Sequence, residues 1–219
     1  ILSFTMLIPM LVDFSSGSQN WFGFASAALI SCFVGISLWL TNRTKQELNL
    51  GLKEAFLLTN SAWVLSGIFG AFPFLFSDLG LSFTDALFES ISGITTTGST
   101  ILTKIELASP GIILWRALLQ WLGGIGIIVM ALAILPILSV GGMQLFKTET
   151  YEASDNAIPR ARQLAGGIFG VYASLTLIWT GMLWLAGMSG FDALIHSMTT
   201  LATGGYSSKT ASVGAFDSV

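Results

Sequence analysis

The chain has 219 residues, of which 53% are hydrophobic and 10% are charged, and its formal net charge is −3. Soluble domains carry about 25% charged residues, so this composition excludes an ordinary water-exposed surface and indicates a protein embedded in lipid. The small negative charge also argues against a nucleic-acid partner. The single cysteine, Cys32, cannot form an internal disulfide, and its apolar neighbours are typical of a small buried side chain.

Long apolar segments dominate the chain from its first residue. A helix that crosses a bilayer needs about 20 apolar residues, and the segments of suitable length are 21–40, 54–76, 111–140 and 164–187. Residues 1–12 are too few to span alone. Because the chain starts without a methionine, we expect them to be the outer end of a truncated helix in a longer protein. A cleaved signal peptide is the alternative, but the sequence lacks a basic n-region and a clear small-residue cleavage site.

Two shorter apolar segments, 83–95 and 190–201, lie between the predicted spans and lead into polar stretches. Those stretches are "ITTTGST" after the first segment and "LATGGYSS" after the second. Both segments are too short to cross a bilayer, and irregular backbone is tolerated at membrane depth only where it is buried or lines a cavity. We therefore predict two re-entrant half-helices, each of which ends in a pore loop.

Lysine and arginine predict the orientation of the spans. The basic residues of loops 41–53 and 141–163 are Arg43, Lys45, Lys53, Lys147, Arg160 and Arg162. The opposite side carries Lys104, Arg116 and Lys209 together with Asp13, Asp78, Asp85, Glu89, Glu106, Asp192 and Asp217. The positive-inside rule places the two loops in the cytoplasm and both half-helices at an acid-rich outer mouth, which concentrates cations. For Asp85 and Asp192 we expect helix capping as the main role.

The half-helices belong to an internal repeat. The segment "SFTDALFESISGITTTGS" at 82–99 aligns without a gap with "SGFDALIHSMTTLATGGY" at 189–206, and Gly98 matches Gly205. Both copies begin with the Ser-x-x-Asp pattern of a capped helix. The predicted unit is helix, half-helix, polar loop and helix. It gives a first pore repeat at 54–140 and the start of a second, truncated repeat at 164–219.

The composition of the two loops suits a cation filter. A cation that enters a membrane must lose its water, and a row of inward-pointing backbone carbonyls replaces that shell. Glycine permits the dihedral angles that turn successive carbonyls to one side, so Gly98 and Gly205 are the expected filter glycines. The carbonyls expected to coordinate the ion are those of Thr96, Thr97, Thr203 and Gly204. A helix C-cap followed by a turn uses the same glycine and is the alternative for each loop taken alone.

Arg116 and Gln120 lie one helical turn apart near the outer end of the span at 111–140. An arginine at membrane depth is a functional candidate by default. We expect Arg116 to support the filter, either by bonding loop carbonyls or by pairing with Glu89 of the half-helix. Snorkelling of its charged end to the lipid headgroups is the alternative.

Other residues favour structural roles over chemistry. Gly123, Gly124 and Gly126 allow close approach between helices, with a hinge as the alternative. His196 is more typical of a hydrogen-bonded structural residue than of a proton relay. An enzyme is not expected, because the sequence has no HExxH or G-x-S-x-G motif, and one cysteine with one histidine cannot form a zinc site. The conceivable catalytic pair is His196 with Ser207 or Ser208.

Three stretches carry a resemblance to a known family. They are "DALFESISGITTTGST" at 85–100, "QWLGGIGIIVMALAILPILSVGGMQLF" at 120–146 and "FDALIHSMTTLATGGYSS" at 191–208. They resemble the Trk/Ktr/HKT superfamily of potassium transporters, and specifically its bacterial Trk membrane subunit, over essentially the whole chain. An N-terminal transmembrane helix pair at 1–40 resembles the Trk branch, because Ktr-type subunits lack that pair.

The resemblance implies an all-α, multi-pass protein of the bacterial inner membrane that takes up potassium ions without a cofactor. Because two loops cannot close a carbonyl ring, at least two further units are expected, and the family implies four in a pseudo-four-fold, potassium-channel-like arrangement. It also implies a homodimer and a cytoplasmic nucleotide-binding regulatory ring, with loop 141–163 as the expected contact. Glycine rather than serine at Gly98 favours potassium. A sodium-permeable or weakly selective channel of this fold and a non-conducting membrane scaffold remain as alternatives.

Overall fold

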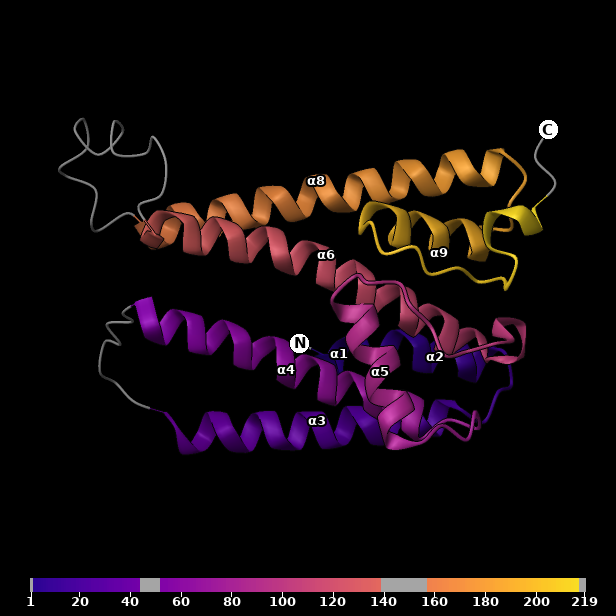
Figure 1. Cartoon of the computed structure of the whole chain (residues 1–219), viewed down its shortest axis with the longest axis horizontal. Coiled ribbons are helices and arrows are strands. Elements are labelled where there is room, and N and C mark those ends of the chain that lie inside the picture. The colour runs from indigo at the N-terminus through magenta and orange to yellow at the C-terminus, as the bar shows by residue number, and fades with distance from the viewer. Residues whose placement is uncertain (1, 44–51, 139–156, 217–219) are drawn as a thin grey trace.

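The computed structural model describes residues 2–43, 52–138 and 157–216, and the regular structure within these ranges is helical. The α-helices are α1 (Leu2–Thr5), α2 (Leu7–Ser15), α3 (Trp21–Thr41), α4 (Leu52–Leu75), α5 (Phe83–Ile94), α6 (Pro110–Leu138), α8 (Ala157–Leu185) and α9 (Gly190–Leu201). Two 3-10 turns, η1 (Ile105–Leu107) and η2 (Ser212–Ala215), follow α5 and α9. Figure 1 shows α3, α4, α6 and α8 as long rods along one direction, with α5 and α9 packed among them.

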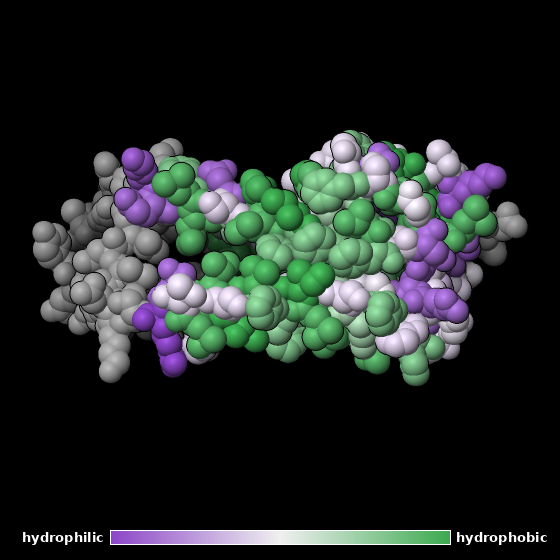
Figure 2. All heavy atoms as spheres, turned by 90° about the horizontal axis from the view of Figure 1, so that it is seen from below, coloured by the Kyte–Doolittle hydropathy of each residue, from purple (hydrophilic) through white to green (hydrophobic). Residues whose placement is uncertain are grey.

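Four helices of the described ranges are long and apolar enough to cross a membrane. Their apolar parts are Trp21–Thr41, Phe56–Leu75, Pro110–Met130 and Ala165–Leu185, which agree with the spans predicted from the sequence. One face of the molecule carries an apolar band between hydrophilic ends (Figure 2). Length, composition and this band together identify an integral membrane protein.

The two loops predicted to be cytoplasmic connect helix ends that lie at the same end of the bundle (Figure 1). Thr41 and Leu52 flank the first connection, and Leu138 and Ala157 flank the second. Much of both loops, including Lys45, lies outside the described residues. Which side of the membrane this end faces therefore stays a prediction.

The half-helices α5 and α9 are each 12 residues long, about half of a membrane span. Ser82 caps α5, because its hydroxyl oxygen accepts the Asp85 N–H at 3.2 Å and its hydroxyl donates to the Asp85 carboxylate at 2.7 Å. Ser189 and Asp192 repeat this arrangement at 3.1 and 2.7 Å. The capping role predicted for both aspartates is confirmed.

The central helix is α6, which contacts both half-helices. Buried residues make up 61% of its span, against 11% for the span of α8. A Cβ at Gly123 would overlap the carbonyl oxygen of Ile94, the last residue of α5, and a Cβ at Gly124 would lie 3.0 Å from the Cα of Ala202, just after α9. These glycines let α6 pack directly on the ends of α5 and α9, as the predicted close approach requires.

Asp13 of α2 positions the beginning of α6. Its carboxylate is fully buried and accepts the Gly111 N–H at 2.7 Å and the Ser109 hydroxyl at 2.9 Å. An acidic group at a helix N-terminus satisfies free N–H groups and interacts favourably with the helix dipole. Counting Asp13 and Glu89 among the acids of an outer mouth is wrong, because both are fully buried and hydrogen-bonded.

Gly123→Ala tests the close packing of α6 on α5. Alanine is normally preferred over glycine in a helix by about 0.5–1 kcal/mol, yet here its methyl group would meet the Ile94 carbonyl, so we expect a loss of about 1–3 kcal/mol. Gly170→Ala, in an exposed part of α8 with open space around it, is the matched control and should be neutral or stabilising. Thermal unfolding of the solubilised full-length protein measures both, and equal stability of the two variants would contradict the packing.

Candidate functional site: two paired pore loops

The loops that follow α5 and α9 have the same backbone conformation. Thr96 and Thr203 both have a φ of 55°, and Gly98 and Gly205 have φ values of 79° and 78°. A non-glycine residue at positive φ is uncommon and costs about 1–3 kcal/mol, so it persists only where its surroundings enforce it. The same costly conformation at matched positions shows that the internal repeat extends through the loops.

The main-chain hydrogen bonds of the loops are also repeated. In the first loop the N–H groups of Thr97 and Gly98 donate to the Ser92 carbonyl at 2.9 and 3.4 Å, and in the second loop the Thr199 carbonyl accepts the equivalent pair at 2.9 and 3.5 Å. These bonds terminate the helices, as the C-cap alternative requires. They involve the N–H groups of the loop residues and not their carbonyl groups. Within the described residues no hydrogen bond is made to the carbonyl oxygens of Thr96, Thr97, Thr203 or Gly204. The C-cap bonds of each loop therefore leave these four carbonyl oxygens without a hydrogen bond in the described residues.

A buried ion pair contacts both loops. Arg116 Nε of α6 lies 2.7 Å from Glu89 Oε1 of α5, and the two side chains are 1% and 0% exposed. Glu89 also accepts the Thr100 hydroxyl at 2.8 Å and the Ile101 N–H at 3.1 Å, directly after the first loop. Arg116 Nη1 donates to the Ser207 carbonyl, after the second loop, at 3.1 Å. The burial of Arg116 excludes snorkelling.

Tyr206 forms a second junction between the repeats. Its ring lies beside the Arg116 guanidinium, whose Cζ is 4.0 Å from the ring centroid. Its hydroxyl lies 3.0 Å from the Glu89 carbonyl oxygen and 3.2 Å from that of Ser99. Its main-chain N–H donates to Gln120 Oε1 at 3.1 Å. The second loop is thus attached to the first repeat through both its side chain and its backbone.

The two loops touch each other at Gly98 and Gly204. A Cβ at Gly98 would overlap the Gly204 carbonyl oxygen, and a Cβ at Gly204 would overlap the Gln120 amide. Close approach and positive φ together require glycine at Gly98. Gly205 has open space around it, so its own requirement for glycine comes from its φ alone.

His196 occupies in the second repeat the position of Glu89 in the first. Its Nδ1 lies 2.8 Å from the Asp192 carbonyl oxygen, and its Nε2 lies 3.0 Å from the Ser207 hydroxyl. Ser207 also accepts the Lys209 N–H at 3.0 Å. Glu89 and His196 therefore both anchor the residue that leaves a loop, and these contacts agree with a structural role for His196.

The connections that follow the two loops are joined at Glu106 and Thr210. The Glu106 carboxylate accepts the Thr210 hydroxyl at 2.6 Å and the Thr210 N–H at 2.7 Å. These two hydrogen bonds lower the pKa of the exposed Glu106 to about 2. The carboxylate is therefore charged under ordinary conditions and holds the two extramembrane connections together.

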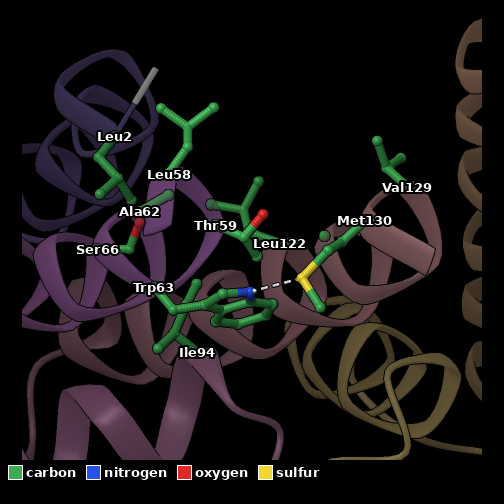
Figure 3. Close-up of a pocket in the computed structure, with 11 residues that line it drawn as sticks. Leu2, Leu58, Thr59, Ala62, Trp63, Ser66, Ile94, Leu122, Val129 and Met130 are labelled. Carbon is green, nitrogen blue, oxygen red and sulfur yellow. Dashed lines mark hydrogen bonds between the residues drawn. The ribbon is translucent and has the colours of Figure 1, made fainter. Parts of the chain in front are cut away.

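A cavity of about 420 Å³ lies between α1, α4 and α6. It begins near Ile94 at the end of α5, and Figure 3 shows Trp63 directed toward Met130, with its indole N–H 3.2 Å from the sulfur. Its lining contains no charged side chain.

Sequence reasoning missed Tyr206 and assigned no role to Gln120. The signal for Tyr206 was weak, because the repeat aligns it with a small residue, Ser99. Gln120 offered a clearer signal, since it is a polar side chain within an apolar span, one turn from Arg116. The structure brings both together with the predicted loop residues.

Fold and site define a helical membrane protein whose chain folds back into the bundle twice and places two matched loops against one central helix. A family model described as "TrkH: Cation transport protein" matches residues 20–219. The chain therefore belongs to the TrkH family of cation transport proteins.

Individual relatives agree with this assignment. The chain is 42% identical over 216 residues to the Trk system potassium uptake protein TrkI of Halomonas elongata, covering 99% of this chain and 44% of that protein. It is 43% identical over 221 residues to the Trk system potassium uptake protein TrkH of Escherichia coli K12, covering all of this chain and 46% of that protein. The crystal structure of the potassium transporter TrkH from Vibrio parahaemolyticus matches with a TM-score of 0.86 at 37% identity, over 99% of this chain and 43% of that chain. The chain thus spans about half the length of these relatives.

Arg116→Leu removes one partner of the buried ion pair. We expect it to lower stability by about 3–5 kcal/mol, because Glu89 is then buried without a counter-charge. The double variant Arg116→Leu, Glu89→Gln removes both charges and should recover part of that loss. Arg43→Leu, at an exposed position, is the control and should change little. Thermal unfolding in detergent measures the stability of all these variants. If the loss in the double variant equals the sum of the losses in Arg116→Leu and Glu89→Gln, the two residues are not coupled.

Proposed function

We propose that this chain is part of a potassium uptake protein and that its two loops contribute main-chain carbonyls to a selectivity filter. The observation that carries the proposal is the matched pair of loops, whose N–H groups are bonded to helix ends while the carbonyls of Thr96, Thr97, Thr203 and Gly204 accept no hydrogen bond within the described residues. The transported ion is suggested by the relatives, which are named as potassium uptake proteins.

The filter is proposed to be pseudo-four-fold, with 54–140 as one pore repeat and 164–219 as the start of the next. Carbonyl filters surround an ion with a ring of loops, and two loops supply half of a four-fold ring. The relatives are about twice as long as this chain, which leaves room for two more units. The helix pair at 1–40 would flank the first repeat, where α2 already contacts α6.

Arg116 and Glu89 are proposed to support the filter. A loop at membrane depth must satisfy its polar groups within the protein. The pair reaches the main chain after the first loop at Ile101 and after the second at Ser207. It would therefore keep both loops in the conformation that directs their carbonyls to the ion.

The free energy for uptake need not come from a cofactor or from bond-making. An inside-negative membrane potential contributes about 2.3 kcal/mol per unit charge for each 100 mV, which favours inward movement of a cation. Potassium is thus the transported ligand of this subunit. Glycine at Gly98 supports selectivity for potassium over a sodium-permeable or weakly selective pore.

A non-conducting scaffold is the other alternative, and the loop conformations disfavour it. Thr96 and Thr203 both carry the strain of a positive φ, which is retained at functional sites more often than elsewhere. A loop that only filled space in the bundle would have no need for the same strained residue twice.

The cellular setting follows from the family as a further part of the proposal. The protein would lie in the bacterial inner membrane, form a homodimer and bind a cytoplasmic nucleotide-binding ring. Loop 141–163 is the proposed contact for that ring, and most of it lies outside the described residues.

Gly98→Ser tests the filter in the full-length protein, expressed in a bacterial strain that lacks potassium uptake. The added side chain would meet the Gly204 carbonyl, and the strain of about 1–3 kcal/mol predicts that growth requires about tenfold or more external potassium. Gly80→Ser is the matched control, because Gly80 also has positive φ, at 64°, but lies in an exposed turn with open space around it.

Three outcomes separate the alternatives. Rescue by the wild type and by Gly80→Ser, but not by Gly98→Ser, supports the filter. Failure of the wild type to rescue growth contradicts potassium uptake and favours a scaffold. Reversal potentials in mixed sodium and potassium that follow both ions equally would contradict potassium selectivity and favour the weakly selective channel.

A further inference from the structure

Gln120 is a fully buried polar side chain that contacts both loops. It is 0% exposed, and its Oε1 accepts the Tyr206 N–H at 3.1 Å. A Cβ at Gly204 would overlap its amide, and a Cβ at Gly98 would lie 3.8 Å from its Nε2. The end of this side chain therefore lies beside the two glycines at which the loops touch.

The amide of Gln120 is costly to bury. Its Nε2 has no hydrogen-bond partner in the part of the chain that the structure describes. Buried polar groups are normally paired, so an unpaired one in a native structure calls for an explanation. The neighbours of Gln120 in sequence are Leu119 and Trp121, and an apolar residue at this position would avoid the cost.

The hydrogen bond to Tyr206 fixes the direction of a loop carbonyl. The Tyr206 N–H and the Gly205 C=O belong to one planar, trans peptide unit, so they point in opposite directions. Because Gln120 draws the N–H toward α6, the Gly205 carbonyl must point away from α6. Gly205 is exposed and has open space around it, and within the described residues the bond to Gln120 is the one hydrogen bond made by the N–H and C=O of this peptide unit.

We infer that Gln120 is a positioning residue that orients the Gly205 peptide and spaces the two loops, and thereby sets the discrimination between potassium and sodium. This inference rests on the proposed filter function. Discrimination between the two ions depends on how many carbonyls reach the ion and how closely they approach. Without the anchor, glycine at Gly205 leaves the peptide free to rotate, and the filter loses a defined carbonyl.

Two variants of nearly equal size separate the hydrogen bond from packing. Gln120→Met keeps the length of the side chain but places a methyl group where the amide oxygen accepts the Tyr206 N–H. Gln120→Glu keeps an oxygen acceptor at the same place. Thr176→Val is the matched control, because Thr176 is a buried polar residue of α8 that accepts the Trp121 indole N–H at 2.9 Å, in contact with α6 but not with the loops.

The measurement is the ratio of sodium to potassium uptake by the full-length protein in proteoliposomes, which does not depend on the amount of folded protein. We expect Gln120→Met to raise this ratio by about tenfold, the effect of losing one buried hydrogen bond, and Gln120→Glu and Thr176→Val to stay within about threefold of the wild type. An unchanged ratio in Gln120→Met would overturn the inference. So would an equal rise in Gln120→Glu or in Thr176→Val.

Hydrogen exchange of the peptide that contains Tyr206 gives a readout that does not require transport. The Tyr206 amide should exchange faster in Gln120→Met and as in the wild type in Gln120→Glu. If the wild type carries no potassium while this exchange pattern is found, the proposed function fails and the anchor stands. If the wild type carries potassium and exchange is the same in all variants, the anchor fails and the proposed function stands.

Discussion

Polar main chain at membrane depth has no water to bond with, and the buried pair of Arg116 and Glu89 meets this constraint for both loops at once. Each charge is balanced by the other, Glu89 accepts the Ile101 N–H after the first loop, and Arg116 Nη1 donates to the Ser207 carbonyl after the second loop. The middle of α5, the residue after the second loop and the N-terminal part of α6 are thereby held together. The loop conformations depend on this junction, because positive φ at a threonine persists only in a rigid setting.

The two repeats have the same backbone but different supports. Glu89 and His196 occupy equivalent positions, and both bond the hydroxyl of the residue that leaves the loop, Thr100 in one copy and Ser207 in the other. Tyr206 has no aromatic counterpart in the first loop, where the aligned residue is Ser99. The repeated element is thus the path of the chain, and the side chains around it differ because each loop has different neighbours.

Local patterns in the sequence predicted much of this structure. The spans, the two half-helices with their serine caps and the register of the repeat follow from apolar length and from contacts within a few residues, and all are found at the expected positions. The roles of Asp13 and Tyr206 were not predicted, because their hydrogen-bond partners lie far along the chain. Gly111 is 98 residues from Asp13, and Gln120 is 86 residues from Tyr206. The sequence analysis placed Asp13 among the acids of the outer mouth. In the structure Asp13 is buried at the N-terminus of α6, where it has a structural role.

Ion conduction through these loops requires their carbonyls to point at the ion in the assembled protein. The most direct test is a crystal structure of the full-length protein grown with rubidium, an ion that replaces potassium and is located by its anomalous scattering. We expect rubidium next to the carbonyl oxygens of Thr96, Thr97, Thr203 and Gly204, on an axis shared with the remaining loops. Ordered rubidium elsewhere, with these oxygens turned toward lipid or bonded to other main-chain groups, would contradict it.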